Sequence, residues 1–119
     1  MPHGFDDTQW DAAKREAVEI LSARARDRSM IPYSELVGQI ESVNFQPHDK
    51  RFFDFLGEIS TEESEAGRGM LSALVVHKSG DMQPGPGFFE LARDLGKNTK
   101  DIVACWVEEF KCVYKAHAV

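Results

Sequence analysis

The chain has 119 residues, of which 42% are hydrophobic and 29% charged, and its formal net charge is −6. This length and composition are typical of one folded globular domain and argue against a disordered chain. The acidic balance argues against polyanion binding by the whole surface. The sequence has no apolar stretch of the roughly 20 residues that span a bilayer, and MPHGFDDTQW lacks the segments of a signal peptide, so we expect a cytoplasmic protein without membrane association.

The first predicted element is an N-terminal helix within residues 5–28. Apolar residues recur there at helical spacing between charged ones: Trp10, Ala13, Ala17, Ile20 and Leu21. Asp7 or Thr8 is positioned to cap this helix. We expect it to end near Arg28, because Pro32 disfavours helix at the residue before it.

Residues 32–66 predict a helix-turn-helix. Ser34 is the candidate cap of a short first helix, and Asp49 is the candidate cap of a second helix over residues 49–59. The inner side of the second helix is apolar and consists of Phe52, Phe53, Leu56 and Ile59. This second helix is therefore the predicted recognition helix.

Residues 67–89 predict a wing. The segment MLSALVVH, residues 70–77, is apolar on both alternating faces, which is typical of a strand buried on both sides. KSGD has the composition of a tight turn. MQPGPGFF is then an irregular second arm, because prolines cannot donate hydrogen bonds within a central strand.

Residues 90–119 predict two C-terminal helices, a short one ended by Gly96 and a long one. The long helix has one apolar stripe, formed by Ile102, Val103, Trp106, Val107, Phe110, Val113 and Tyr114. We expect this stripe to pack against the N-terminal helix. Part of its surface, at Trp106 and Phe110, could remain for a protein partner or for a second copy in a homodimer.

Three compact helices followed by a β-hairpin form the winged helix-turn-helix arrangement. The sequence therefore predicts an α+β fold in which residues 1–119 form a single winged-helix domain. The N-terminal helix and the C-terminal helices extend that domain at its two ends.

Three segments carry a resemblance to a known family: YSELV at residues 33–37, FLG at residues 55–57, and the strand and turn residues Val75, Val76, Ser79 and Gly80. They are similar to segments in the winged-helix domain of the O6-alkylguanine DNA alkyltransferases and the alkyltransferase-like proteins. Where that family has its alkyl-accepting cysteine, a histidine and a base-replacing arginine, this chain has Ser72, Ala73 and Asp54. The resemblance thus implies the fold without alkyl transfer, because a serine without a neighbouring base is not nucleophilic. GRGMLSALVVHK and PGPGFFELA are also similar to segments of a group of small uncharacterised bacterial proteins.

The first function hypothesis is non-catalytic binding of double-stranded DNA. The helix over residues 49–59 would lie in the major groove and the wing over residues 77–83 on the flanking groove. The candidate contacts are Tyr33, Ser34, His48, Lys50, Arg51, Lys78 and Ser79. Each has an ordinary alternative, as a solvated helix start, a half-buried tyrosine or the polar tip of a turn.

The alternative hypothesis is an acidic protein-interaction or dimerisation module without DNA binding, which the net charge of −6 motivates. Trp106 and Phe110, together with the arm from Pro84 to Phe89, would then contact the partner. We expect no catalytic residues, no metal ligands and no cofactor. Ser72 and His77 are five residues apart and would point to opposite faces of a strand, and the acidic residues Glu58, Glu62, Glu63 and Glu65 are typical of a solvated face.

Overall fold

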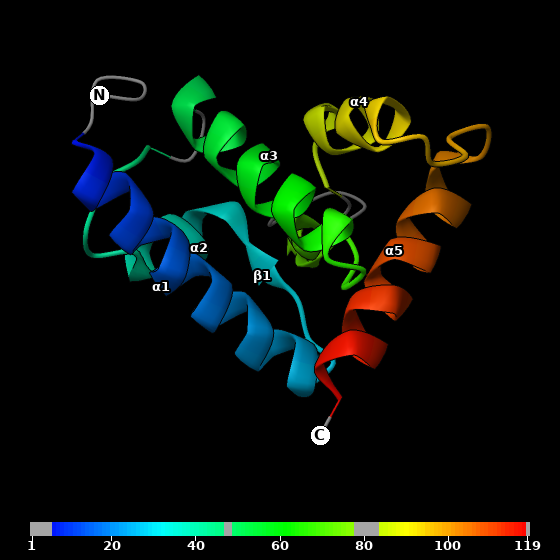
Figure 1. The fold of residues 1–119 in the computed structure, drawn as a ribbon, viewed down its shortest axis with the longest axis horizontal. Helices are drawn as coiled ribbons and strands as arrows, with labels where there is room; N and C mark the ends of the chain where they lie inside the picture. The colour runs from blue at the N-terminus through cyan, green and yellow to red at the C-terminus, as the bar shows by residue number, and fades with distance from the viewer. Residues whose placement is uncertain (1–5, 47–48, 78–83, 119) are drawn as a thin grey trace.

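Helices dominate this computed structural model, which describes residues 6–46, 49–77 and 84–118. In chain order its elements are α1 (Asp7–Arg26), β1 (Ile31–Pro32), α2 (Tyr33–Gln39), α3 (Lys50–Glu65), the 3-10 helix η2 (Leu71–Leu74), β2 (Val75–Val76), α4 (Pro86–Asp94) and α5 (Ile102–His117). Figure 1 shows α3 beside α4, and α1 and α5 converging at their C-terminal ends. Among the described residues, no helix is long and apolar enough to cross a membrane.

The predicted α+β winged helix-turn-helix fold is wrong. A wing is an antiparallel hairpin, whereas β1 and β2 are two-residue strands that pair in parallel, with Ile31 opposite Val75 and Pro32 opposite Val76. The segment predicted as the first arm of the wing is helical over Leu71–Leu74. The segment predicted as the end of the second arm starts α4 at Pro86. The predicted turn KSGD and the first two residues of the second arm, together residues 78–83, lie outside the described residues.

The ambiguity of the apolar run and contacts with distant residues explain this difference. A short, continuously apolar run fits a buried strand and a buried helical turn equally well, and all four residues of η2 are buried. Partners distant in the sequence hold the backbone there: the N–H of Met70 donates to a carboxylate oxygen of Glu109, and the N–H of Ser72 to the hydroxyl of Ser60. Pro86 favours helix because its fixed φ and missing N–H suit the first helical turn.

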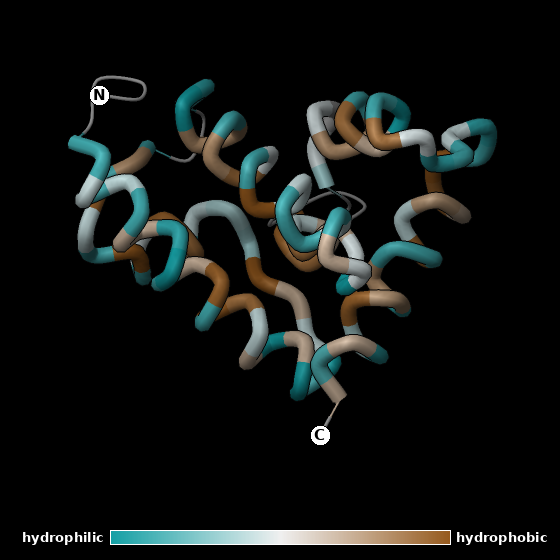
Figure 2. Tube along the Cα trace, in the orientation of Figure 1, coloured by the Kyte–Doolittle hydropathy of each residue, from teal (hydrophilic) through white to brown (hydrophobic). Residues whose placement is uncertain are grey.

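The interior contains two apolar clusters. The larger one joins α1, α2, α3, α5, η2 and both strands, and within it the ring of Trp10 meets that of Phe55 edge to face, with 5.2 Å between centroids. Phe45 packs on both rings. The smaller cluster lies beneath α4 and α5 and contains Met70, Ala73, Phe88, Ala92 and Cys105. Hydropathy alternates along α1 and α3, as expected for helices with one buried face (Figure 2).

The start of α3 is as predicted. A carboxylate oxygen of Asp49 accepts a hydrogen bond from the backbone N–H of Arg51 at 2.9 Å, which caps the helix. The first helix begins slightly earlier than expected, because Asp6 rather than Asp7 or Thr8 is its cap. Its carboxylate oxygen accepts from the N–H of Thr8 at 2.8 Å.

Candidate ligand groove between α3 and α4

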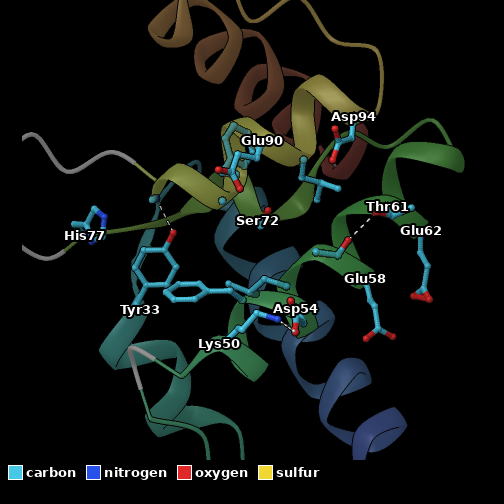
Figure 3. Close-up of a pocket in the computed structure, with 17 residues that line it drawn as sticks. Tyr33, Lys50, Asp54, Glu58, Thr61, Glu62, Ser72, His77, Glu90 and Asp94 are labelled. Carbon is cyan, nitrogen blue, oxygen red and sulfur yellow. Dashed lines mark hydrogen bonds and ion pairs between the residues drawn. The ribbon is translucent and has the colours of Figure 1, made fainter. Parts of the chain in front are cut away.

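A groove of about 990 Å³ opens between α3 and α4 (Figure 3). Its lining is mostly apolar, and the residues that form its floor are Phe53, Leu56, Gly57, Phe88 and Leu91. The two helices approach each other at Gly57, where an added Cβ would lie 3.8 Å from Cδ2 of Leu91. Because residue 57 has no side chain, the floor stays open at this crossing. Ligand pockets commonly measure about 300–1,000 Å³, so this groove can hold several side chains.

One end of the groove is polar. The hydroxyl oxygen of Tyr33, at the start of α2, accepts a hydrogen bond from the backbone N–H of Gly85 at 2.8 Å. The Tyr33 ring lies 5.3 Å from the imidazole of His77 and 5.8 Å from the ring of Phe53, between centroids. Burial raises the pKa of Tyr33, although the Gly85 bond acts in the opposite direction. At neutral pH the phenol therefore keeps a hydrogen that it can donate to an occupant.

A pair of serines supports the back of the groove. Ser60 of α3 is fully buried, and its hydroxyl donates to Oγ of Ser72 at 2.5 Å. In return, Oγ of Ser60 accepts from the backbone N–H of Ser72 at 2.9 Å. Ser72 and His77 line the same groove, which differs from the expectation of opposite faces, because strand alternation does not apply to the 3-10 helix that contains Ser72.

The lining also carries strong negative charge. Its acidic side chains lie on successive turns of the two helices, Asp54, Glu58 and Glu62 on α3 and Glu90 and Asp94 on α4. Lys50 is the basic residue of the lining, and its Nζ lies 3.6 Å from Asp54. The Nζ of Lys14, on α1, lies 3.6 Å from Glu58 and 2.7 Å from Glu62. Glu58 and Glu62 are thereby held toward α1, where the indole N–H of Trp10 also donates to Glu58. Between α3 and α4 the carboxylates of Asp54, Glu90 and Asp94 outnumber the ammonium group of Lys50, so the groove is electronegative.

The structure brings together two of the seven predicted DNA contacts, Tyr33 and Lys50, which both line the groove. Ser34 is exposed at the start of α2. The Arg51 guanidinium binds Asp49, with 2.6 Å between Nη2 and Oδ2, and this bond holds the pKa of that carboxyl below its usual range. Three predicted contacts lie outside the described residues: His48, Lys78 and Ser79.

The two predicted partner contacts on α5 take part in packing. The indole N–H of Trp106 donates to the carbonyl oxygen of Ala73 at 2.8 Å, and its ring meets that of Phe110 edge to face. Both side chains are half-buried. The large apolar side chains that α5 exposes are Ile102 and Val103, at its first turn.

The acidic residues of α3 do not share one solvated face as expected. Glu63 is buried and binds the guanidinium of Arg68, while Glu58 and Glu62 reach Lys14. In the described ranges, the His, Cys, Asp and Glu side chains form no group of three or more that could hold a metal ion.

Sequence reasoning missed the α4 wall of the groove. Glu90 and Asp94 are four residues apart, as are Asp54 and Glu58, and such spacing signals a shared helix face. Whether these two helix faces line the same groove depends on how α4 packs against α3. No local sequence pattern determines that packing.

Comparison with known proteins finds no match for this chain among protein-family models, curated proteins or solved structures. The resemblance to the alkyltransferases stays a prediction.

Proposed function

We propose that this chain is a non-catalytic protein-interaction module, and that its groove between α3 and α4 receives apolar side chains of a partner protein. One observation carries the proposal: a groove of about 990 Å³ with an open apolar floor formed by side chains of both helices. Such surface is costly to leave in contact with water, and an open apolar groove is a common site for a partner's side chains.

The polar groups in the groove support binding rather than catalysis. Oγ of Ser72 accepts from Ser60, and the hydroxyl of Tyr33 accepts from Gly85, so both hydroxyls are fixed by the fold. Each retains a hydrogen with which to bind a carbonyl group of a partner backbone. These are the few oriented polar groups that give an apolar site its specificity.

Electrostatics favours this function over DNA binding. Duplex DNA carries one negative charge per about 1.7 Å of its axis. Lys50, a predicted DNA contact, lies in a groove whose lining includes five carboxylates. The predicted DNA-binding mode also needed a wing to contact the flanking groove of the DNA. That wing was part of the winged-helix fold prediction, which is wrong. DNA binding itself stays a prediction, as does the cytoplasmic location.

The proposed function is tested with a neutral amphipathic peptide of about 14 residues, roughly four helical turns, with leucines along one face and glutamines elsewhere. Titration into the ¹⁵N-labelled full chain should shift the amide signals of Leu56, Gly57 and Leu91. A Gly57→Leu substitution should remove these shifts by filling the floor. A matched Gly38→Leu substitution on α2, where an added Cβ meets nothing within 4 Å, should leave them. Shifts that persist in Gly57→Leu, or an absence of shifts in the native chain, would overturn the proposal.

The DNA alternative is tested by fluorescence anisotropy of a labelled duplex at about 50 and 200 mM salt, where phosphate contacts show their salt dependence. We expect no binding at either salt concentration. Binding that weakens with salt and disappears in a Lys50→Glu, Arg51→Glu variant would favour DNA recognition by the start of α3.

A further inference from the structure

We propose that the partner segment which enters the groove is a basic amphipathic helix, with apolar residues against the floor and lysines or arginines against the carboxylates of α4. This inference rests on the proposed function and adds the chemistry of the partner. Acidic side chains lie beside an apolar floor in the groove. Together, these two features restrict the chemistry of a bound segment more than either does alone.

The apolar floor sets the shape of the occupant. Phe53 and Leu56 lie one turn apart on α3, and Phe88 and Leu91 lie one turn apart on α4. A helix with apolar residues three or four positions apart presents a stripe that matches such a floor. Addition of an extended strand is disfavoured, because β1 and β2 have two residues each and Ile31, Val75 and Val76 are buried.

The charges on the two walls set the sign of the occupant. On α3, Asp54 has Lys50 at 3.6 Å, and Glu58 and Glu62 share Lys14. On α4, Glu90 and Asp94 form no ion pair with any residue in the described part of the chain, and both belong to the groove lining. Figure 3 shows these two side chains on α4, whereas the side chains of Glu58 and Glu62 on α3 extend away from α4. The occupant that complements Glu90 and Asp94 is therefore positively charged.

The position of these carboxylates beside an apolar floor strengthens their effect. A bound helix would displace water from the floor, and charge pairs at the edge of a water-poor contact attract more strongly than pairs in open solvent. Lysine and arginine suit this position, because their aliphatic stems can cover apolar surface while their charged ends reach the rim. The same carboxylates would repel polyanions, including DNA and acidic membrane surfaces.

The test uses three peptides with the same leucine face, in which the remaining positions are glutamine, lysine or glutamate. Titrated into the full chain at about 50 mM salt, the lysine peptide should bind about tenfold more tightly than the glutamine peptide, and the glutamate peptide more weakly than both. Raising the salt to about 200 mM should narrow this difference, because the Debye length falls below 10 Å.

A pair of variants assigns the effect to the groove. Glu90→Gln with Asp94→Asn should remove most of the preference for the lysine peptide over the glutamine peptide. Glu19→Gln with Glu108→Gln, two exposed acidic residues on α1 and α5, changes the net charge equally and should keep the preference.

The outcomes separate this inference from the function on which it rests. If the glutamine and lysine peptides bind the groove equally, or the control pair removes the preference as fully as the α4 pair, the basic partner is wrong and the interaction module stands. If none of the three peptides shifts the groove signals, the proposed function fails, and this inference fails with it.

Discussion

The hydroxyl oxygen of Tyr33 accepts a hydrogen bond at 2.8 Å from the backbone N–H of Gly85, a residue 52 positions later in the chain. Tyr33 starts α2, and Gly85 is the residue before α4. The bond therefore joins two segments at the polar end of the groove, and it fixes the position from which α4 departs.

A Tyr33→Phe substitution should lower the free energy of unfolding by about 1 kcal/mol, because it keeps the ring but leaves the Gly85 N–H without its acceptor. Urea unfolding measures the loss. The matched control is Tyr114→Phe, a second half-buried tyrosine, whose hydroxyl makes no hydrogen bond within the described residues. Equal losses in the two variants would show that the Gly85 bond contributes nothing specific.

Ser60 and Ser72 should respond unequally to replacement by alanine. Ser60→Ala removes both the donor to Oγ of Ser72 and the acceptor of its N–H, at a fully buried position, and should cost about 2 kcal/mol. Ser72→Ala leaves Oγ of Ser60 bound to the same N–H and should cost about 1 kcal/mol. The double variant should resemble Ser60→Ala, because the two residues act as one unit. Equal costs for the two single variants, measured by chemical denaturation, would contradict this arrangement.

Gly69 should tolerate alanine less well than Gly67. Both have a positive φ, +87° and +80°, which costs an alanine about 1–2 kcal/mol. At Gly69 the added Cβ would also lie 3.1 Å from Sγ of Cys112 and from Cγ2 of Val113, whereas at Gly67 it meets nothing within 4 Å. Crowding of this kind typically costs a further 1–3 kcal/mol or so. We therefore expect a clearly lower melting temperature for Gly69→Ala than for Gly67→Ala, and similar temperatures would show that α5 moves aside easily.

Glu16 should make the free energy of unfolding depend on pH under acidic conditions. The hydroxyl of Ser42 donates to its carboxylate, as do the backbone N–H groups of Ser42 and Glu41, and these bonds lower the pKa of Glu16. A carboxyl with a lowered pKa in the folded state stabilises the fold above its unfolded pKa, about 4.3, and loses that contribution as the pH falls through the folded value.

A Glu16→Gln variant should therefore be less stable than the native chain at pH 7, and the difference should shrink as the pH is lowered toward 3. Urea midpoints across this range measure it. Glu19→Gln makes the same change in charge at an exposed position on α1 and serves as the control. A difference between Glu16→Gln and the native chain that is constant with pH would show that the bonds to the carboxylate are not the cause.

The helices could be predicted from the sequence because their signals are local. The period of Trp10, Ala13 and Ala17 placed a helix within residues 5–28, where α1 spans Asp7–Arg26. The cap at Asp49 placed the start of α3. The segment over residues 70–77 was predicted as a strand because a fully apolar run has no period, and its backbone conformation depends on Ser60 and Glu109, which lie far away in the sequence.

The groove was not predicted from the sequence, although two of its lining residues were predicted as DNA contacts. Tyr33 and Lys50 were recognised as candidate contacts from their positions at helix starts, and both line it. The floor at Gly57 and Leu91 could not be recognised, because it exists only where α3 and α4 cross. Predicting a wing also placed Pro86 and Gly87 in its irregular second arm, although they belong to the first turn of α4.

Segments far apart in the sequence complete the larger apolar cluster: Ile31 pairs with Val75 in parallel, and Val113 is buried in the same cluster. The cluster therefore stays incomplete until the last part of the chain has been synthesised. At a synthesis rate of about 5–20 residues per second, α5 leaves the ribosome on the order of 10 s after α1. During that interval Trp10 and the phenylalanines that pack on it are outside the ribosome without the segments that complete their cluster. A nascent chain that stalls or terminates before Val113 would keep this surface exposed, and it would be a substrate for chaperones and proteases rather than a shorter working module.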